Sequence, residues 1–276
     1  MRKQLRRLIR MTGYDVHRCR PNLGQFLISR NIDLFLDVGA NVGQTGLQLR
    51  EMGYRGRIVS FEPVSAVFNE LAQLAKRDGN WTAYNFALGS QQMRTSIKVS
   101  ENTVFSSVRD QTEEPCLFDP SARVLREEVI DVRRLDDIYE EFSGRRVFLK
   151  IVTQGFEREV LEGSQRALKT ILGAELNLPT VQLYRNVWSL PEALLYMKDR
   201  GFVLAQTGQE SYDAHEGVTL LELYCIFRRE NVLSSKANAS PSLFKGADQL
   251  DELGDAQRQR DRYAASPVAS AGPHQN

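Results

Sequence analysis

The chain has 276 residues, of which 42% are hydrophobic, enough to build one sizeable core or two small ones. Its 36 lysines and arginines nearly balance 35 acidic residues, so the net charge of +1 gives no overall signal for nucleic-acid binding. Three scattered cysteines and three scattered histidines argue against a disulfide framework, a zinc site or a histidine metal cluster. This composition fits a cytoplasmic protein.

Residues 1–30 form a basic leader in which apolar residues recur near helical spacing. Its first ten residues carry Arg2, Lys3, Arg6, Arg7 and Arg10. The leader could be an ordinary amphipathic helix packed on the domain, or residues 1–11 could make peripheral contact with an anionic membrane. No stretch of the chain reaches the roughly 18 apolar residues needed to span a bilayer.

From residue 31 to residue 229, short apolar runs alternate with amphipathic segments. The runs predict strands at 34–39, 57–62, 82–86, 147–151, 173–178 and 220–228. The amphipathic segments predict helices at 43–52, 64–78 and about 156–168. This alternation predicts an α/β fold with a mainly parallel sheet and helices on both faces.

Two parts of the chain are less regular. Residues 88–145 contain two further strand-like runs, at 95–99 and 128–132, around a polar stretch at 100–127. We interpret this stretch as a lid or substrate-facing insertion, because long irregular segments in compact domains are usually functional or disordered. Residues 230–276 are rich in Ser, Ala, Asp, Gln, Gly and Pro, which predicts a disordered tail after the domain at 31–229.

The turn between the first strand and the first helix of the domain carries the strongest chemical signal. Gly39 and Gly43 lack a Cβ atom, so the backbone can approach a ligand there, beside the positive end of the following helix. Glu62 ends the second strand, about 20 residues further on, where an acidic side chain can accept hydrogen bonds from ribose hydroxyls. Together these features predict a nucleoside-containing cofactor; the alternative is a turn that only packs helix on strand.

The residues of the turn favour S-adenosylmethionine over NAD. A dinucleotide site would need Gly-x-Gly-x-x-Gly, but here Asn41 stands at the middle glycine position. Asp37 would repel a pyrophosphate, whereas a cationic sulfonium with an amino group would be attracted to it.

An ordered series of motifs makes the chain resemble the FkbM family of methyltransferases. They are FLDVGANVGQ at 35–44, SFEP at 60–63, NFALG at 85–89, LKI with TQGFE at 149–157, VLEG at 160–163, ELNL at 175–178, LY at 183–184, GF at 201–202 and CIF at 225–227. The resemblance implies a Rossmann-like class I methyltransferase fold with an antiparallel last strand. It also implies methyl transfer, typically to a hydroxyl.

The same resemblance suggests which residues bind the cofactor and the acceptor. The residues expected to bind S-adenosylmethionine are Asp37, Gly39, Ala40, Asn41, Gly43, Gln44, Glu62, Pro63, Ala87 and Leu88. Of these, the turn would surround the methionine part, Glu62 would hold the ribose, and Pro63 with Ala87 and Leu88 would border the adenine. The residues expected on the acceptor side are Ser106, Ser107, Thr153 and Gln154.

Two positions depart from the family pattern. Val152 stands where the family usually has aspartate, and Tyr224 and Cys225 stand where its last strand usually has aspartate and glycine. In the family pattern, an acid at position 152 could deprotonate or orient a hydroxyl or help to bind a metal ion. Because this chain lacks that acid and the acid of the last strand, we predict no metal site. Both departures also allow a non-catalytic scaffold that keeps the fold.

The remaining candidates for catalysis are Glu175, Lys150 and His215, although a solvated loop histidine is the simpler interpretation of His215. Glu175 could act as a base or orient the acceptor, or it could make only a structural hydrogen bond. Lys150 could act as a base if burial lowered its pKa, although a structural ion pair is the simpler interpretation.

The sequence thus predicts an O-methyltransferase that uses S-adenosylmethionine. Its acceptor would be a hydroxyl of a sugar, a glycolipid or polysaccharide, or a small natural product. The alternative is the non-catalytic scaffold, and no nucleic-acid partner is expected. The sequence names neither the acceptor nor the oligomeric state.

Overall fold

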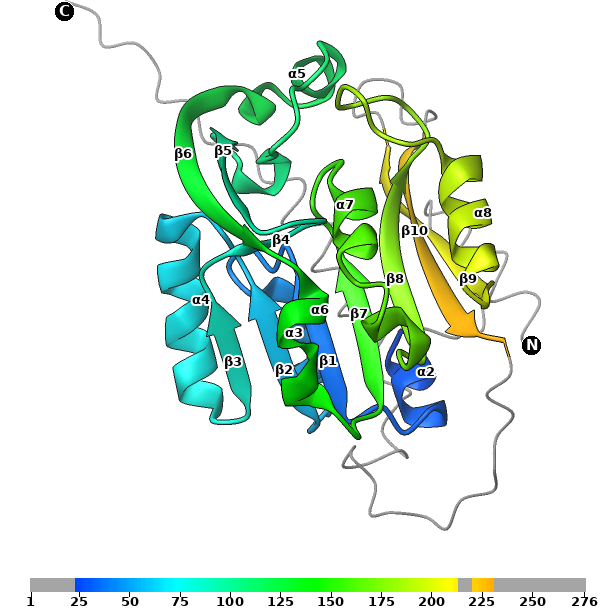
Figure 1. Ribbon diagram of the computed structural model, residues 1–276. Coiled ribbons are helices and arrows are strands. Elements are labelled where there is room, and N and C mark those ends of the chain that lie inside the picture. Colours follow the sequence, from blue (N-terminus) through cyan, green and yellow to red (C-terminus); the bar gives the residue numbers. More distant parts are fainter. Residues whose placement is uncertain (1–22, 213–219, 231–276) are drawn as a thin grey trace, which may run out of the picture. The chain divides into compact units, whose positions relative to one another are not determined.

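The computed structural model describes residues 23–212 and 220–230, so the predictions for residues 1–11 and for the tail concern residues outside the described part (Figure 1). A seven-stranded sheet has the order β3-β2-β1-β7-β8-β10-β9. Its strands are β1 (Leu34–Val38), β2 (Arg57–Phe61), β3 (Trp81–Tyr84), β7 (Val147–Ile151), β8 (Gly173–Pro179), β9 (Phe202–Tyr212) and β10 (Leu220–Arg229). All are parallel except β10, which is antiparallel to both neighbours, as predicted.

Helices cover both faces of this sheet, because its central strands are apolar on both sides; all five residues of β1 are buried. One face packs on α2 (Leu23–Ser29), α3 (Gln44–Glu51) and α4 (Ser65–Asp78). The other face packs on α6 (Leu135–Ile138), α7 (Glu157–Glu162) and α8 (Leu190–Asp199). The predicted arrangement of helices is therefore confirmed.

Helix α2 lies within the segment expected to be a leader. Its Phe26 and Leu27 are buried in the same cluster as Phe35 and Phe148 of the sheet, and the Phe26 and Phe148 rings meet edge to face. The packed domain therefore includes residues from Leu23 onward. No helix among the described residues is long and apolar enough to cross a membrane.

A second, three-stranded sheet with the order β4-β6-β5 is built from the irregular middle of the chain. Its strands are β4 (Ala87–Leu88), β5 (Met93–Ser100) and β6 (Val124–Arg133). Ile97, Val99 and Ile130 pack against Val64 and Val67 at the start of α4. Between β5 and β6 lie the short helices η1 (Thr103–Phe105), α5 (Glu114–Phe118) and η2 (Pro120–Ala122). The stretch at 100–127 is thus largely ordered, and it stands above the carboxyl ends of the main sheet (Figure 1).

The helix expected at about 156–168 is wrong in its extent. Helix α7 ends at Glu162, and only a 3-10 turn, η4 (Ala167–Lys169), follows. The carboxylate of Asp136 accepts the backbone N–H groups of Arg166 and Ala167, which removes them from a continuous helical ladder. A further 3-10 turn, η3 (Tyr139–Phe142), extends α6.

Of the longer elements, α8 and β9 were not predicted, and neither were the short elements β4, α5 and α6. Helix α8 begins at a capping box in which the Ser189 N–H and hydroxyl both donate to Glu192. The Ser-x-x-Glu spacing was a readable signal for this helix. Within the described part of the chain, strand β9 pairs with β10 alone, at the sheet edge.

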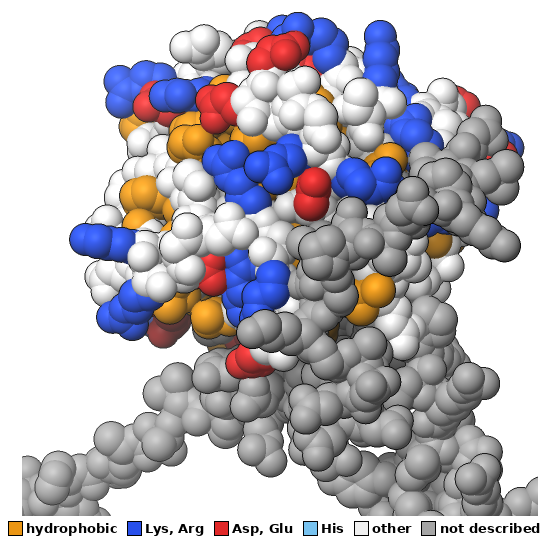
Figure 2. All heavy atoms as spheres, turned by 90° about the horizontal axis from the view of Figure 1, so that it is seen from below, with side chains coloured by type: hydrophobic (Ala, Val, Ile, Leu, Met, Phe, Trp, Pro, Cys, Tyr) orange, Lys and Arg blue, Asp and Glu red, His pale blue; other side chains and the backbone are white. Residues whose placement is uncertain are grey.

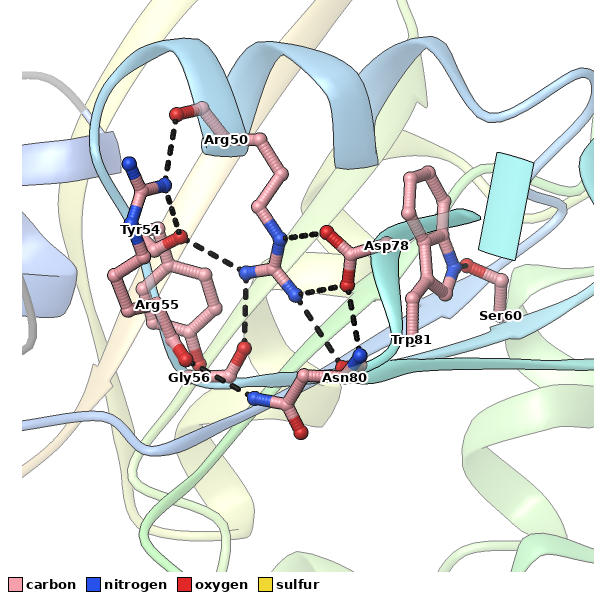
Figure 3. Close-up of polar contacts among 8 residues, drawn as sticks. All are labelled: Arg50, Tyr54, Arg55, Gly56, Ser60, Asp78, Asn80 and Trp81. Carbon is pink, nitrogen blue, oxygen red and sulfur yellow. Dashed lines mark hydrogen bonds and ion pairs between the residues drawn. The ribbon is translucent and has the colours of Figure 1, made fainter. Parts of the chain in front are cut away.

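Arg50, near the end of α3, ties this helix to the start of β2 and to the end of α4 (Figure 3). Its guanidinium makes two hydrogen bonds with the Asp78 carboxylate, at 2.7 and 2.9 Å. It also donates to the carbonyl oxygens of Tyr54, Gly56 and Asn80. The Arg50 side chain therefore supplies hydrogen bonds to carbonyl oxygens of both the loop before β2 and the turn before β3.

Replacing Arg50 by glutamine should lower the melting temperature by about 5 °C, because several charge-assisted hydrogen bonds are lost together. Thermal unfolding followed by circular dichroism measures the shift. Arg77→Gln, an exposed position on α4, is the control and should move it by about 1 °C or less. An equal shift in both variants would contradict a special role of Arg50.

Figure 2 shows the end of the molecule at which the parallel strands begin, opposite to their carboxyl ends. Basic, acidic and uncharged side chains lie interspersed there. A cavity of about 460 Å³ at this end is lined by Arg145, Arg146 and Arg166, but also by Asp136 and Glu140. It lies away from the glycine turn, which is at the carboxyl ends of the strands.

Candidate functional site

The glycine turn lies between β1 and α3 and is left-handed at three positions, Gly39, Asn41 and Gly43. A Cβ atom added to Gly39 would lie 2.0 Å from the carbonyl oxygen of Val152. Gly39 is therefore required by the approach of the protein's own backbone after β7, in addition to any ligand. Gly43 has φ +94° and rests against the Trp81 ring, whose N–H donates to Ser60 at 2.9 Å.

Glu62, directly after β2, reaches across to this turn. One carboxylate oxygen accepts the Asn41 N–H at 2.9 Å, and the other accepts the Val64 N–H at 2.9 Å. The side chain is 6% exposed. Burial raises the pKa of the Glu62 carboxyl to about 7, although the two backbone N–H groups oppose the shift. Each oxygen keeps a lone pair that could accept a ribose hydroxyl.

Asp37 lies fully buried on β1, and Lys150 is its register partner on β7. The Lys150 ammonium is 3.3 Å from Asp37 Oδ1. Asp37 Oδ2 is buried without a hydrogen-bond partner among the described residues. A carboxylate oxygen left in this state beneath the turn suits a ligand that brings a cationic or hydrogen-bond-donating group.

Thr103, in the insertion, also meets the glycine turn. Its hydroxyl lies 3.0 Å from the Asn41 side-chain amide, although the two residues are far apart in sequence. The Asn41 side-chain oxygen in turn accepts the Val42 N–H, and Gln44 donates to it weakly at 3.4 Å. No local motif marks Thr103, and sequence analysis missed it.

The loop after β7, which carries two of the residues expected on the acceptor side, is held by Glu157. This buried carboxylate accepts the N–H groups of Thr153 and Gly155 and the hydroxyl of Thr153. Burial raises the pKa of Glu157, while these donors lower it. Ser107 is buried and donates to the Gln154 carbonyl oxygen at 2.6 Å, so three of the four predicted acceptor-side residues meet here. Ser106 instead accepts the Ser100 N–H at the insertion's own turn.

Of the residues expected beside the adenine, Pro63 follows Glu62 directly, whereas Ala87 and Leu88 form β4. Asn85 donates to the carbonyl oxygens of Glu62 and Pro63, which fixes the turn after β2. Ala87 is half-buried, whereas Leu88 is 1% exposed and belongs to the main core. Contact of these residues with adenine stays a prediction.

Glu175 and Lys150, two of the candidate catalytic residues, lie inside the sheet, and the third, His215, lies outside the described residues. Glu175 on β8 is the register partner of Lys150, and both are buried. Lys150 makes the ion pair with Asp37 that was the simpler interpretation. A catalytic role for either stays a prediction.

Of the three positions that depart from the family pattern, one follows β7 directly and two lie on β10. The Val152 N–H donates to the Val38 carbonyl oxygen, so this side chain follows β7 directly beside the glycine turn. The Tyr224 ring packs on Gly208. Burial raises the pKa of the Cys225 thiol to about 11, so that position offers no thiolate near neutral pH. Among the described residues, no three His, Cys, Asp or Glu side chains are grouped to hold a metal ion.

The strand order, the antiparallel β10 and the turn joined to an acidic residue after β2 define a class I methyltransferase, whose cofactor is S-adenosylmethionine. The chain matches the Methyltransferase FkbM domain over residues 37–204. It belongs to the FkbM family of S-adenosylmethionine-dependent methyltransferases.

No curated protein has a matching sequence. Among solved structures, magnesium protoporphyrin IX methyltransferase from Synechocystis PCC 6803 is 11% identical at a TM-score of 0.40, with 82% of this chain and 96% of that chain covered. A TehB-like methyltransferase from Corynebacterium glutamicum is 12% identical at a TM-score of 0.36, with 83% of this chain and 96% of that chain covered. M. capricolum TrmK is 8% identical at a TM-score of 0.42, with 78% of this chain and 73% of that chain covered. The family assignment rests on the domain match alone.

The raised pKa of Glu62 predicts pH-dependent cofactor binding. The charged carboxylate accepts ribose hydroxyls better than the protonated acid, so affinity should fall as the pH drops through about 7. Between pH 8 and pH 6 the dissociation constant of S-adenosylhomocysteine should rise about tenfold. Calorimetry across this range measures it, and a flat profile would contradict the assignment.

Proposed function

We propose that this methyltransferase transfers the methyl group to a hydroxyl of a sugar, a glycolipid or polysaccharide, or a small natural product. The observation that carries the proposal is the joining of the turn at Asn41 to Glu62 and to Thr103 of the insertion. The insertion therefore lies next to the glycine turn. Through Ser107 it also contacts the loop after β7. This arrangement suits a small acceptor, or a single sugar unit of a larger glycan, enclosed by the insertion better than a nucleic acid laid across an open surface.

In this proposal the chain's own residues mainly bind and orient. Asp37 Oδ2 attracts the amino group of the cofactor, Glu62 accepts the ribose hydroxyls, and Gly39, Ala40 and Gly43 give the turn its close backbone approach. Bound S-adenosylmethionine supplies a methyl group already activated on a sulfonium. Holding the acceptor hydroxyl in line with that group supplies much of the rate enhancement.

The test is incubation of the purified protein with methyl-labelled S-adenosylmethionine and a panel of deoxysugars, glycolipids and polyketide-type alcohols. Transfer of label to a hydroxyl, located by mass spectrometry, is the expected result. Cofactor binding without transfer to any acceptor would favour the non-catalytic scaffold. Salt-sensitive RNA binding and methylation by the domain would overturn the expectation that nucleic acid is not the partner.

A further inference from the structure

Gln154 is an unusual residue of the loop after β7. Its backbone is left-handed, with φ 54°, which is uncommon for a residue with a side chain. The residue is 7% exposed. Its side-chain oxygen, Oε1, is buried and has no hydrogen-bond partner among the described residues. An amide oxygen in this state destabilises a fold, so its retention calls for another reason.

The backbone around Gln154 is fixed on every side, so the loop does not relax to satisfy that oxygen. Ser107 donates to the Gln154 carbonyl oxygen at 2.6 Å. Glu157 accepts the N–H groups on both sides, from Thr153 at 2.8 Å and from Gly155 at 3.0 Å. A Cβ atom on Gly155 would lie 2.6 Å from the Val187 side chain, so the loop is packed as well. The side chain is therefore presented by a rigid support.

The loop after β7, which carries Gln154, lies beside the glycine turn, on the side where the acceptor is expected. Val152, two residues earlier, has its carbonyl oxygen against Gly39. The four residues Val152 to Gly155 are all uncharged. Of the carboxylates in α7, Glu157 accepts the loop's N–H groups, and Glu159 is paired with Arg109, which also donates to the Gly155 carbonyl oxygen. Because Arg109 and Glu159 already pair with each other, a charged group would lose its hydration here without an unpaired opposite charge in return, so a neutral hydrogen-bond donor is favoured.

We propose that Gln154 Oε1 accepts a hydrogen bond from an uncharged hydroxyl of the methyl acceptor and thereby selects neutral alcohols over charged acceptors. The proposal rests on the proposed function and adds the class of acceptor and the atom that reads it. A carboxamide does not take up a proton near neutral pH, so Gln154 orients the hydroxyl and does not act as a base.

The variant Gln154→Met keeps the length of the side chain but removes the unsatisfied oxygen. Its melting temperature should rise by about 2 to 4 °C. The dissociation constant of S-adenosylhomocysteine should stay within about twofold of wild type. The matched control is Gln111→Met, because Gln111 donates to Ser100, Phe105 and Ala122. That variant should have a lower melting temperature.

The activity arm compares methyl glucopyranoside, whose hydroxyls are neutral, with the corresponding methyl glucuronide at equal concentration. Wild type should prefer the neutral glycoside at least about tenfold in kcat/KM, and Gln154→Met should lose most of this preference. A lower melting temperature for Gln154→Met, or preferred methylation of the glucuronide by wild type, would overturn the proposal. Wild type that binds no S-adenosylhomocysteine would instead defeat the proposed function, while the melting temperatures still decide whether the Gln154 oxygen is structural.

Discussion

Glu62→Gln should weaken S-adenosylhomocysteine binding about 100-fold, which corresponds to about 2.7 kcal/mol. The carboxylate offers two oxygens, and each already accepts a backbone N–H, from Asn41 and from Val64. Glutamine has only one oxygen, so its NH₂ group would face one of these N–H donors. The variant therefore loses the charge toward the ribose hydroxyls and also disturbs the turn that holds the cofactor.

Calorimetric titration of wild type and variant at pH 8 measures this effect, because the wild-type carboxyl is then mostly ionised. Glu127→Gln is the control: Glu127 is exposed on β6 and bonds only the Ser96 hydroxyl among the described residues. It should leave the affinity within about twofold. A folded Glu62→Gln protein with wild-type affinity would exclude Glu62 from the cofactor site.

Gly39→Ala should lower the melting temperature by about 10 °C and abolish measurable binding of S-adenosylhomocysteine. The left-handed backbone, with φ +76°, disfavours any side chain by roughly 1–2 kcal/mol. The larger part comes from the contact with the Val152 carbonyl oxygen at 2.0 Å. Since both partners are backbone, β1 and β7 must separate at their carboxyl ends to admit the methyl group.

Gly79→Ala separates these two contributions. Gly79 caps α4 with φ +79°, nearly the same φ as Gly39, but a Cβ atom there would meet nothing within 4 Å. It should lower the melting temperature by only about 4 °C and leave cofactor binding intact. Similar shifts in both variants would show that backbone strain alone, and not the approach of Val152, makes Gly39 necessary.

The position of Val152 shows where the departure from the family pattern lies in the structure. Its N–H donates to Val38 and its carbonyl oxygen meets Gly39, so the backbone keeps the place that an acid would occupy beside the turn. The valine therefore leaves this position beside the turn without a carboxylate. In our proposal, Gln154, whose backbone is held by Ser107 and Glu157, supplies the polar group of this loop.

The sequence by itself determined the sheet, the turn and the family. Apolar runs such as Leu34 to Val38 are buried on both faces, so their composition alone indicates parallel strands covered by helices. The spacing from Gly43 to Glu62 is local to one strand-helix-strand unit, in which the geometry of a right-handed crossover brings the two ends together. Pattern and spacing suffice wherever the partners belong to one such unit.

Only the tertiary structure decided the contacts between distant segments. Thr103 reaches Asn41, Ser107 reaches Gln154, and Lys150 pairs with Asp37, each across at least 47 positions in the chain. No periodicity encodes such pairs, because the chain between them can take many paths before the sheet closes. The end of α7 was misjudged for the same reason, since Asp136 takes the N–H groups of Arg166 and Ala167 from outside that helix. The glycine turn and the insertion were thus readable from the sequence, whereas the contacts that join the insertion and the loop after β7 to each other and to the turn became visible only in the fold.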